Sequence, residues 1–600
     1  MDETIPARFA RQAAALGTKP LFLVKRRGTY QPITWAEAAE TVQAFSAFLL
    51  SRKINAGDRV VILSENRPEW GIADLAIQSV GAWSVPIYPS LTAQDLHVIF
   101  QDCQPSLCVA STTDQANKLL EVSRRVASIH TIVVMDAGEA RHPLESSWAA
   151  SVAQGREQSA AYRDTLKQRQ GAITPDETAT LIYTSGTTGE PKGVMLSHRN
   201  FLSNVEASLQ AIPVSDQDLH LSFLPLSHVF ERMGGWYLML SVGACVAYAE
   251  SMDTIPQNML EVRPTIMLGV PRFFEKLYLR MQEGLRQASP MKRRLAEWAI
   301  GVGRAVNAYR FEGKPVPIGW AIQHAIADRL VFQKFKARLG GRVRFFVSGG
   351  APLSQEIGEF FYSVGVTILE GYGLTETSPV IAANRLPVPR FGSVGTVLPG
   401  VEVSFATDGE LLTKGPHVMQ GYYHKPDATA AAIEQGWFHT GDIGHIDAQG
   451  HVYITDRKKD LIKTAGGKFV APQKLENLFV TDPAVSQAFV YGEKRPYCVA
   501  LIVPNLDQLR RYAQEQEIVG RSVQELIRDP RVMAWYWQRV DAKQQGLASF
   551  EQVKKIALLD QEFSQASGEL TPTLKAKRNV IAQRYEALLA SLYQTGATSS

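Results

Sequence analysis

Residues 183–193 read YTSGTTGEPKG and begin at the end of an apolar run, 179–183, that predicts a β-strand. The stretch combines three glycines, four Ser or Thr hydroxyls and one lysine. Glycines let the backbone approach a ligand closely, hydroxyl and N–H groups donate hydrogen bonds, and Lys192 adds a positive charge. This composition is typical of a loop that wraps phosphate groups. An isolated Ser/Thr/Gly stretch is more often a plain surface turn, so the interpretation depends on the rest of the chain.

The loop is not a Walker A motif, which requires Gly before the lysine and Ser or Thr after it. Here Pro191 precedes Lys192 and Gly193 follows it. A return strand is predicted at 194–196. A helix is expected next, because apolar residues recur at spacings of four and three between 201 and 212.

Two further strands run into loops of similar character. The run 343–347 leads into SGGAP, and the run 366–369 ends in EGYGLTE. Ligands of open α/β sheets bind at the carboxyl ends of the strands, where all three loops are expected to lie. From residue 400 to 444 the pattern changes to short strands and turns, which favours a β-rich subdomain.

The predicted fold class is α/β: a large N-terminal domain of wound α/β subdomains plus a β-rich subdomain, followed by a small α+β C-terminal domain. The charged stretch TDRKKDLIK marks the expected boundary, which gives domains at 1–456 and 457–600.

Composition excludes several classes of protein. A hydrophobic fraction of 45% over 600 residues provides a large core, and a net charge of +4 is too balanced for binding nucleic acid by general charge. The four cysteines include no C-x-x-C pair, so neither a zinc site nor a disulfide framework is predicted. No secretory signal is predicted at the amino terminus, and the longest uncharged run, 233–249, is too short to span a membrane. A cytoplasmic location is expected.

Five segments, in order along the chain, resemble the adenylate-forming superfamily. They are YTSGTTGEPKG (183–193), EGYGLTE (370–376), WFHTGD (437–442), TDRKKDLIK (455–463) and LTPTLKAKR (570–578). In that family they correspond to the phosphate loop, the adenine and magnesium segment, the ribose segment, the interdomain hinge and the catalytic-lysine motif of the fatty-acid branch.

The resemblance implies a role for each matched residue. ATP phosphates would be bound by Thr184, Ser185, Gly186, Thr187, Thr188, Gly189 and Lys192. Adenine would lie between Tyr372, flanked by Gly371 and Gly373, and the backbone of Gly350, Ala351 and Pro352. Thr375 would bind the α-phosphate, Glu376 would hold Mg²⁺, and Asp442 with Arg457 would bind the ribose hydroxyls. Taken alone, each acid or base is more often a solvated surface charge.

Lys575 is the expected catalytic lysine. A carboxylate attacks the α-phosphate of ATP and pyrophosphate leaves. A lysine between the two anions offsets their repulsion and stabilises the transition state. A thiol, that of CoA, then attacks the acyl adenylate and AMP departs. ATP, Mg²⁺ and CoA are therefore the expected cofactors and cosubstrates.

The segment 224–240, LPLSHVFERMGGWYLML, is similar to long-chain fatty acyl-CoA ligases. It implies an acyl pocket at His228, Val229, Phe230 and Gly269, although simple core packing explains these residues as well. Some relatives place a gating Trp where this chain has Arg232, which leaves the gating of the acyl site open. The alternatives are an acyl-AMP ligase that loads a carrier-protein phosphopantetheine, a ligase for medium-chain or aryl acids, and a noncatalytic nucleotide-binding module. A noncatalytic nucleotide-binding module would have no need of a catalytic lysine such as Lys575.

In this family the small domain rotates between the two half-reactions. Lys459 is the expected hinge residue, and Gly466 and Gly467 would face the CoA path. A second feature lies at 290–344, which holds twelve Lys or Arg and only three acids, with aromatic residues interleaved. Such a surface favours peripheral contact with an anionic membrane, and a solvated helical insertion is the alternative. The sequence predicts no oligomeric state.

Overall fold

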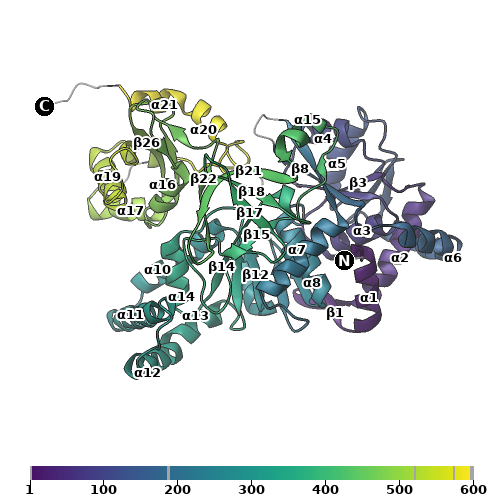
Figure 1. Cartoon of the computed structure of the whole chain (residues 1–600), viewed down its shortest axis with the longest axis horizontal. Coiled ribbons are helices and arrows are strands. Elements are labelled where there is room, and N and C mark those ends of the chain that lie inside the picture. The colour runs from purple at the N-terminus through teal and green to yellow at the C-terminus, as the bar shows by residue number, and fades with distance from the viewer. Residues whose placement is uncertain (1–2, 186–189, 519–521, 572–574, 595–600) are drawn as a thin grey trace.

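The computed structural model describes residues 3–185, 190–518, 522–571 and 575–594. The chain forms two large sheets, a smaller β-rich sheet and a C-terminal α+β part (Figure 1). The predicted α/β fold class is confirmed.

The first large sheet is mostly parallel. Its order is β19 (Gly421–Tyr422), β9 (Pro191–Ser197), β8 (Thr178–Ser185), β4 (Trp83–Ile87), β3 (Arg59–Leu63), β5 (Leu107–Ala110), β6 (Thr131–Val134) and β7 (Glu145–Ser147). The strands β3, β5 and β6 are almost wholly buried, as expected for a sheet covered on both faces. The predicted return strand is confirmed, because β9 pairs antiparallel with β8 and places Thr184 opposite Lys192.

The second large sheet carries the other two predicted loops. Its order is β16 (Thr396–Val397), β15 (Val380–Ala383), β14 (Ile368–Gly373), β13 (Phe345–Ser348), β12 (Ile266–Gly269), β10 (Leu219–Ser222), β11 (Cys245–Tyr248), β1 (Pro20–Arg26) and β2 (Thr29–Thr34). Strands β10 to β14 are parallel. The sequence predicted that EGYG would lie in a loop, which is wrong: residues 371–373 continue β14 because they pair antiparallel with β15.

The predicted β-rich subdomain is a five-stranded antiparallel sheet. Its strands are β17 (Glu402–Phe405), β18 (Glu410–Lys414), β20 (Ile433–Glu434), β21 (Trp437–Ile446) and β22 (Val452–Arg457). The C-terminal part contains two small sheets. One is β23 (Ile462–Lys463) with β24 (Phe469–Val470), and the other is β25 (Val485–Tyr491), β26 (Cys498–Pro504) and β27 (Val553–Leu558). Residues from Ile462 onward build their own hydrophobic clusters.

Helices connect and cover the sheets. Those up to residue 262 are α1 (Ile5–Leu16), α2 (Trp35–Ser51), α3 (Pro68–Ser79), α4 (Ala93–Cys103), α5 (Thr113–Ser123), α6 (Trp148–Ala172), α7 (His198–Ala211), the π-helix η1 (Glu231–Tyr237), α8 (Leu238–Val242) and α9 (Ile255–Val262). The next are α10 (Pro271–Arg286), α11 (Pro290–Phe311), α12 (Ile318–Ala327), the π-helix η2 (Asp328–Phe332), α13 (Gln333–Arg338), α14 (Gln355–Ser363), the 3₁₀ helix η3 (Thr375–Thr377) and α15 (Pro426–Ala432). The C-terminal helices are α16 (Pro472–Phe479), α17 (Leu506–Glu515), α18 (Val523–Leu526), α19 (Pro530–Gln544), α20 (Arg578–Arg584) and α21 (Glu586–Ser591).

Within the described ranges, no helix combines the length and the apolar character needed to cross a bilayer. The uncharged run 233–249 instead forms the end of η1, α8 and β11, and most of it is buried.

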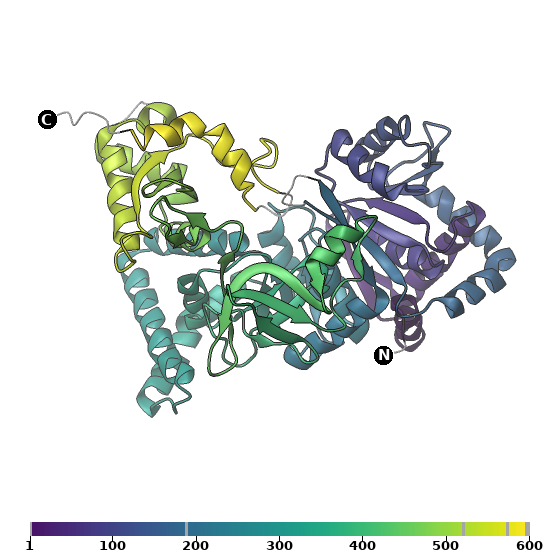
Figure 2. The ribbon, with the colours of Figure 1, turned by 45° about the horizontal axis from the view of Figure 1, so that its top comes forward.

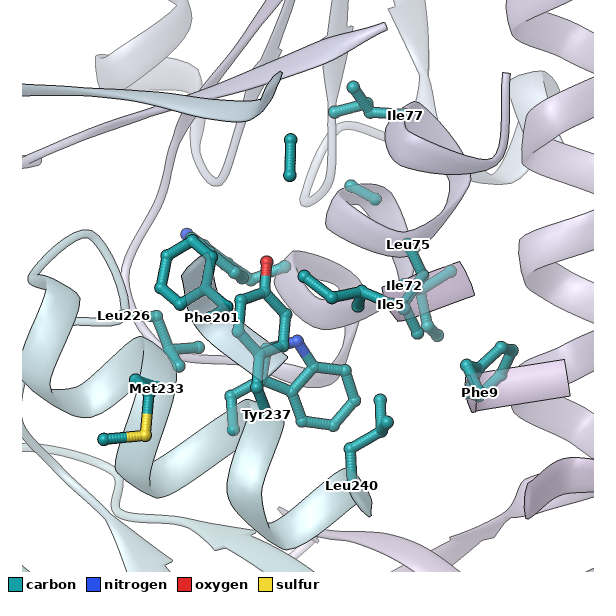
Figure 3. Packing of buried hydrophobic residues seen from close by; sticks show 14 of the residues in the cluster. Ile5, Phe9, Ile72, Leu75, Ile77, Phe201, Leu226, Met233, Tyr237 and Leu240 are labelled. Carbon is teal, nitrogen blue, oxygen red and sulfur yellow. The ribbon is translucent and has the colours of Figure 1, made fainter. Parts of the chain in front are cut away.

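A hydrophobic core joins the two large sheets. Apolar side chains from α1, α3, α7, η1 and α8 converge there, and Tyr237 lies beside Phe201 with ring centroids 5.0 Å apart (Figure 3). Trp236 is buried as well and packs against Phe22.

A buried ion pair lies inside this core. The Arg232 guanidinium is completely buried, forms an ion pair with Asp74 of α3, and donates a 2.6 Å hydrogen bond to Thr180 of β8. Its Nε donates to the Tyr237 hydroxyl at 2.9 Å, and that hydroxyl donates to Asp74 at 2.7 Å. Ser84 of β4 also donates to Asp74, at 2.7 Å. The network therefore ties η1, which packs on the second sheet, to α3, β4 and β8 of the first.

We expect Arg232→Met to lower the free energy of unfolding by about 3–5 kcal/mol, because it leaves the Asp74 carboxylate buried without its counter-charge. Urea unfolding followed by circular dichroism measures the loss. Arg511→Met is the matched control, since the ion pair of Arg511 with Glu515 is exposed and such pairs contribute about 0–1 kcal/mol. Equal losses in the two variants would contradict the structural role of Arg232.

Candidate active site

A cavity of about 2310 Å³ is lined by residues of the two large sheets, the β-rich sheet and the C-terminal part. Its lining includes the carboxyl ends of β8, β13 and β14, as the sequence predicted. Segments separated by almost 400 residues, from Thr184 to Lys575, contribute side chains to it.

The strands that flank the predicted phosphate loop reach the cavity. Thr184 and Lys192 both line it, and the Thr184 hydroxyl donates to the Lys192 carbonyl at 3.5 Å. The Lys192 ammonium lies 4.9 Å from the centre of the Tyr422 ring, a cation–π contact that orients the lysine. Gly186, Thr187, Thr188 and Gly189 lie outside the described residues, as does the side chain of Ser185.

The predicted adenine and ribose residues are brought together. The Tyr372 hydroxyl donates a 2.7 Å hydrogen bond to Asp442, whose other oxygen lies 3.3 Å from Arg457 Nε. Cross-strand pairing of β21 with β22 sets Asp442 opposite Arg457. Burial raises the pKa of Asp442, while Arg457 and Tyr372 act in the opposite direction and favour the carboxylate.

Gly350, Ala351 and Pro352, which follow β13, line the same cavity as Tyr372. Gly350 has a φ of +85°, a backbone conformation that favours glycine over any residue with a side chain. This turn directs the backbone of the segment along the cavity wall.

Thr375 and Glu376 begin the 3₁₀ helix η3 directly after β14, and both line the cavity. The Tyr422 hydroxyl donates to the Glu376 carboxylate at 2.9 Å, and the Glu376 carbonyl accepts from the Met419 N–H at 2.8 Å. Gly373 is required here, since an added Cβ would lie 1.7 Å from the Pro379 carbonyl oxygen. Gly371 meets no such barrier.

Lys575 comes from the far end of the chain into this cluster. Thr571 and Lys575 exchange hydrogen bonds, with Thr571 N–H donating to the Lys575 carbonyl at 2.8 Å and Lys575 N–H donating to the Thr571 hydroxyl at 3.0 Å. Burial lowers the pKa of Lys575 to about 8, the charges of Arg457 and Lys459 lower it as well, and Asp442 and Glu376 oppose them. Both carboxylates that the sequence predicted for the site therefore act on the charge of Lys575.

His228, Val229 and Phe230 line the cavity, and the edge of the Phe230 ring packs against Gly349. Burial lowers the pKa of His228 to about 3, and the charge of Lys575 contributes, so the imidazole is neutral. Its Nδ1 accepts a 3.3 Å hydrogen bond from the Phe230 N–H. Gly269 is not among the described lining residues: it ends β12, and a Cβ there would lie 2.9 Å from the Phe274 ring.

The structure answers the question that Arg232 raised. Arg232 forms the buried ion pair of the core and is not among the described residues that line the cavity. Trp236 packs in the same core. Met233 and Gly234, which follow Arg232 in η1, reach the cavity instead.

Lys459 lines the cavity directly after β22, and burial with the charge of Arg457 lowers its pKa. Gly466 and Gly467 form the turn between β23 and β24, where Gly467 has a φ of +73° and open space surrounds both positions. They are not among the described lining residues, whereas Phe469, two positions later, is.

Sequence reasoning missed two residues of this site. Tyr422, which contacts both Lys192 and Glu376, lies in a stretch that read as an ordinary turn. Glu370 belongs to the quoted EGYGLTE motif and could have been singled out. It is buried at the cavity wall, accepts a 3.1 Å hydrogen bond from the Leu353 N–H, and burial raises its pKa to about 8.

The residues gathered here could hold a magnesium ion in one specific way. Among the described residues there is no cluster of three or more His, Cys, Asp or Glu side chains that could bind a metal by themselves. The Glu376 carboxylate, one of several in the lining, lies at the cavity next to Thr375 in the chain. Mg²⁺ is commonly bound through one or two carboxylates together with substrate phosphates, so this donor set fits Mg²⁺ that arrives with a nucleotide.

Comparisons with known proteins agree with this geometry. The family model described as AMP-binding enzyme matches residues 9–423, and the model described as AMP-binding enzyme C-terminal domain matches residues 459–597. The long-chain-fatty-acid–CoA ligase FadD15 of Mycobacterium bovis is 35% identical over 573 residues, covering 94% of this chain and 93% of the relative. The peroxisomal long chain acyl-CoA synthetase 6 of Arabidopsis thaliana is 34% identical, covering 94% of this chain and 82% of the relative.

A solved structure shares the fold. The A-PCP didomain of carboxylic acid reductase from Segniliparus rugosus, in complex with AMP, has a TM-score of 0.76 and 22% identity, covering 98% of this chain and 82% of that one.

We expect the Lys575 amine to be half-deprotonated near pH 8 rather than near 10.5, the ordinary value for a lysine. The folded protein is acylated at a series of pH values and then digested, and mass spectrometry of the peptide that contains Lys575 gives the midpoint of its deprotonation. Asp442→Asn should lower the midpoint further, because it removes a negative charge that favours the ammonium. A midpoint close to 10.5 would contradict the burial of Lys575 among these charges.

Proposed function

The chain belongs to the AMP-binding enzyme family, and on that basis we propose that it activates a long-chain fatty acid with ATP and transfers the acyl group to CoA. At the level of the family it is an adenylate-forming, acyl-activating enzyme of the acid–thiol ligases. The long-chain substrate and CoA as the acceptor are our proposal.

One observation carries the proposal: the polar cluster around Lys575 and a large set of apolar side chains line the same cavity. One apolar part of the lining comes from the segments after α7 and before η1, from η1 and α8, and from strands β12 and β13. It includes Ile212, Val214, Val229, Phe230, Met233, Leu238, Met239, Ile266, Leu268, Phe345 and Val347. An alkyl chain is held by apolar surface, whereas a short or aromatic acid needs far less of it. Long-chain activity of the 34–35% identical relatives agrees.

The side chains have complementary tasks toward ATP in this proposal. Tyr372 and the backbone of 350–352 enclose the adenine, and Asp442 with Arg457 holds the ribose hydroxyls. Residues 184–189 and Lys192 hold the β- and γ-phosphates, and Thr375 hydrogen-bonds the α-phosphate. Glu376, oriented by Tyr422, would bind the Mg²⁺ that neutralises phosphate charge.

Lys575 brings the two reacting anions together. The fatty carboxylate attacks the α-phosphate, a bond from carboxylate oxygen to phosphorus forms, and the bond to pyrophosphate breaks. With a pKa of about 8 the amine is mostly protonated near pH 7, and its charge stabilises the crowded oxygens of the transition state. His228 lines the same cavity, and because its imidazole is neutral it adds no competing charge.

The second step needs a different arrangement. Lys575 occupies the cavity here, so the arrangement suits adenylation, and the thiol of CoA must reach the same acyl carbon afterwards. We propose that the part from residue 457 to 600 rotates as a domain about Lys459 relative to 1–456, withdrawing Lys575 and turning Gly466 and Gly467 toward the thiol path. The separate hydrophobic clusters after Ile462 support movement as one unit.

We expect each acyl-CoA formed to be accompanied by one AMP and one pyrophosphate, because attack at the α-phosphate expels the β- and γ-phosphates together. Chromatography of the nucleotides, with saturated fatty acids of increasing length and with benzoate as the aryl control, measures both products and preference. ADP as the product would overturn the assignment. Faster turnover of benzoate or medium-chain acids, or a strict need for a carrier protein in place of CoA, would favour the alternatives instead.

We expect Lys575→Ala to reduce acyl-adenylate formation by about 10²–10³-fold, the usual loss for one preorganised charge contact, and to leave conversion of supplied acyl adenylate to thioester largely intact. Carboxylate-dependent pyrophosphate exchange measures the first step and a thiol assay the second. Lys554→Ala is the control, because Lys554 is an exposed lysine of β27 in the C-terminal part and is not among the described residues that line the cavity. Normal exchange in Lys575→Ala would reject its catalytic role.

A further inference from the structure

Helices α11 and α12 form a pair that projects from the body of the molecule, below the C-terminal part (Figures 1 and 2). Helix α11 packs on the core through its buried side chains, including Ala299, Val302 and Val306, and on α14. Helix α12 packs against α11 and is the outer member of the pair. Neither helix contributes to the lining of the cavity described above.

The outward face of α12 is apolar. Ile318, Ile322 and Ile326 recur at intervals of four and are 79%, 56% and 46% exposed, and Leu330 continues the row into η2. The ten residues of α12, IGWAIQHAIA, include no Asp, Glu, Lys or Arg. A helix that is apolar all round is normally buried on every side, yet here one face is open to solvent.

The amino-terminal half of α11 repeats the pattern. Met291, Leu295 and Trp298 are exposed at spacings of four and three, and therefore share one face of that helix. Lys292 and Arg294 flank this row and are exposed as well.

Positive charge surrounds the exposed apolar residues. The segment 290–344 holds twelve Lys or Arg and three acids, and each acid already has a basic partner within the segment. The pairs are Arg293 with Glu297 at 3.8 Å, Lys314 with Glu312 at 2.6 Å, and Lys336 with Asp328 at 2.8 Å. Most of the Lys and Arg residues of this segment therefore have no Asp or Glu within the segment as an ion-pair partner.

We propose that the exposed faces of α11 and α12 dock on the surface of an anionic phospholipid bilayer. The isoleucine row would enter the boundary between headgroups and acyl chains, and the flanking Lys and Arg would contact lipid phosphates. A second copy of this chain fits the surface poorly, because it would oppose two faces with the same excess of positive charge. This inference does not rest on the proposed reaction.

The test is co-sedimentation of the full chain, without nucleotide or fatty acid, with vesicles of phosphatidylcholine and with vesicles of equal parts phosphatidylcholine and phosphatidylglycerol. We expect binding to the anionic vesicles that weakens as salt is added, because salt screens the contact between charges. The double variant Ile322→Asp/Ile326→Asp should bind about tenfold or more weakly, since it removes apolar surface that would leave water.

The control for the apolar row is Ile446→Asp. Ile446 is 47% exposed at the end of β21, far from the helical pair along the chain, and its replacement should leave vesicle binding unchanged. For the charges, Arg329→Glu/Lys334→Glu should weaken binding to anionic vesicles, and Arg124→Glu/Arg125→Glu, exposed at the end of α5, should not. Pyrophosphate exchange with soluble substrate shows that each variant is folded.

Three outcomes would overturn the proposal. The wild-type chain would fail to bind anionic vesicles, or the α12 variant would bind as well as Ile446→Asp, or sedimentation equilibrium would show a dimer that Ile322→Asp/Ile326→Asp dissociates. The last outcome would assign the face to a second copy of the chain.

Discussion

The ion pair between Arg232 and Asp74 is the constraint on which the arrangement of the two large sheets depends. Both side chains are completely buried, so their charges are stable only while each faces the other and while hydroxyls satisfy the remaining donors and acceptors. Thr180, Ser84 and Tyr237 supply those hydroxyls from three different elements. Any sliding of one sheet against the other would break several of these contacts at once.

The cavity inherits its geometry from that network. Arg232 lies in η1 together with Met233 and Gly234, and these two residues line the cavity, as does Phe230 directly before η1. Thr180 lies on β8, the strand that leads to Thr184 and the phosphate loop. The buried ion pair therefore positions η1, which carries part of the apolar lining, and β8, which leads to the polar end of the cavity.

The polar end of the cavity, around Lys575, combines charges of both signs. Lys575, Arg457 and Lys459 converge on Asp442 and Glu376, and the pKa shifts of both lysines reflect repulsion among the cations together with burial. This group of cations favours the binding of a polyphosphate, and the cations repel one another when no anion is bound. The C-terminal part is stabilised by its own hydrophobic clusters and is joined to the cavity through the short connection at β22. The membrane surface proposed on α11 and α12 lies on separate helices, so its occupation leaves the cavity lining free.

The amino-acid sequence by itself determined the fold class, because strand runs, glycine-rich loops and helical periodicity are local patterns. Its resemblance to a known superfamily pointed to several of the polar residues at the cavity. The sequence predicted the return strand β9 and placed Tyr372, Asp442, Glu376 and Lys575 in one site. It placed EGYG in a loop, since the partner strand β15 that extends β14 is a separate segment. Only the tertiary structure decided that Arg232 is a core ion pair rather than part of the acyl site, that Tyr422 orients Glu376, and that the isoleucines of α12 face solvent. Each of these depends on which distant surface a side chain meets, and local periodicity carries no information about that partner.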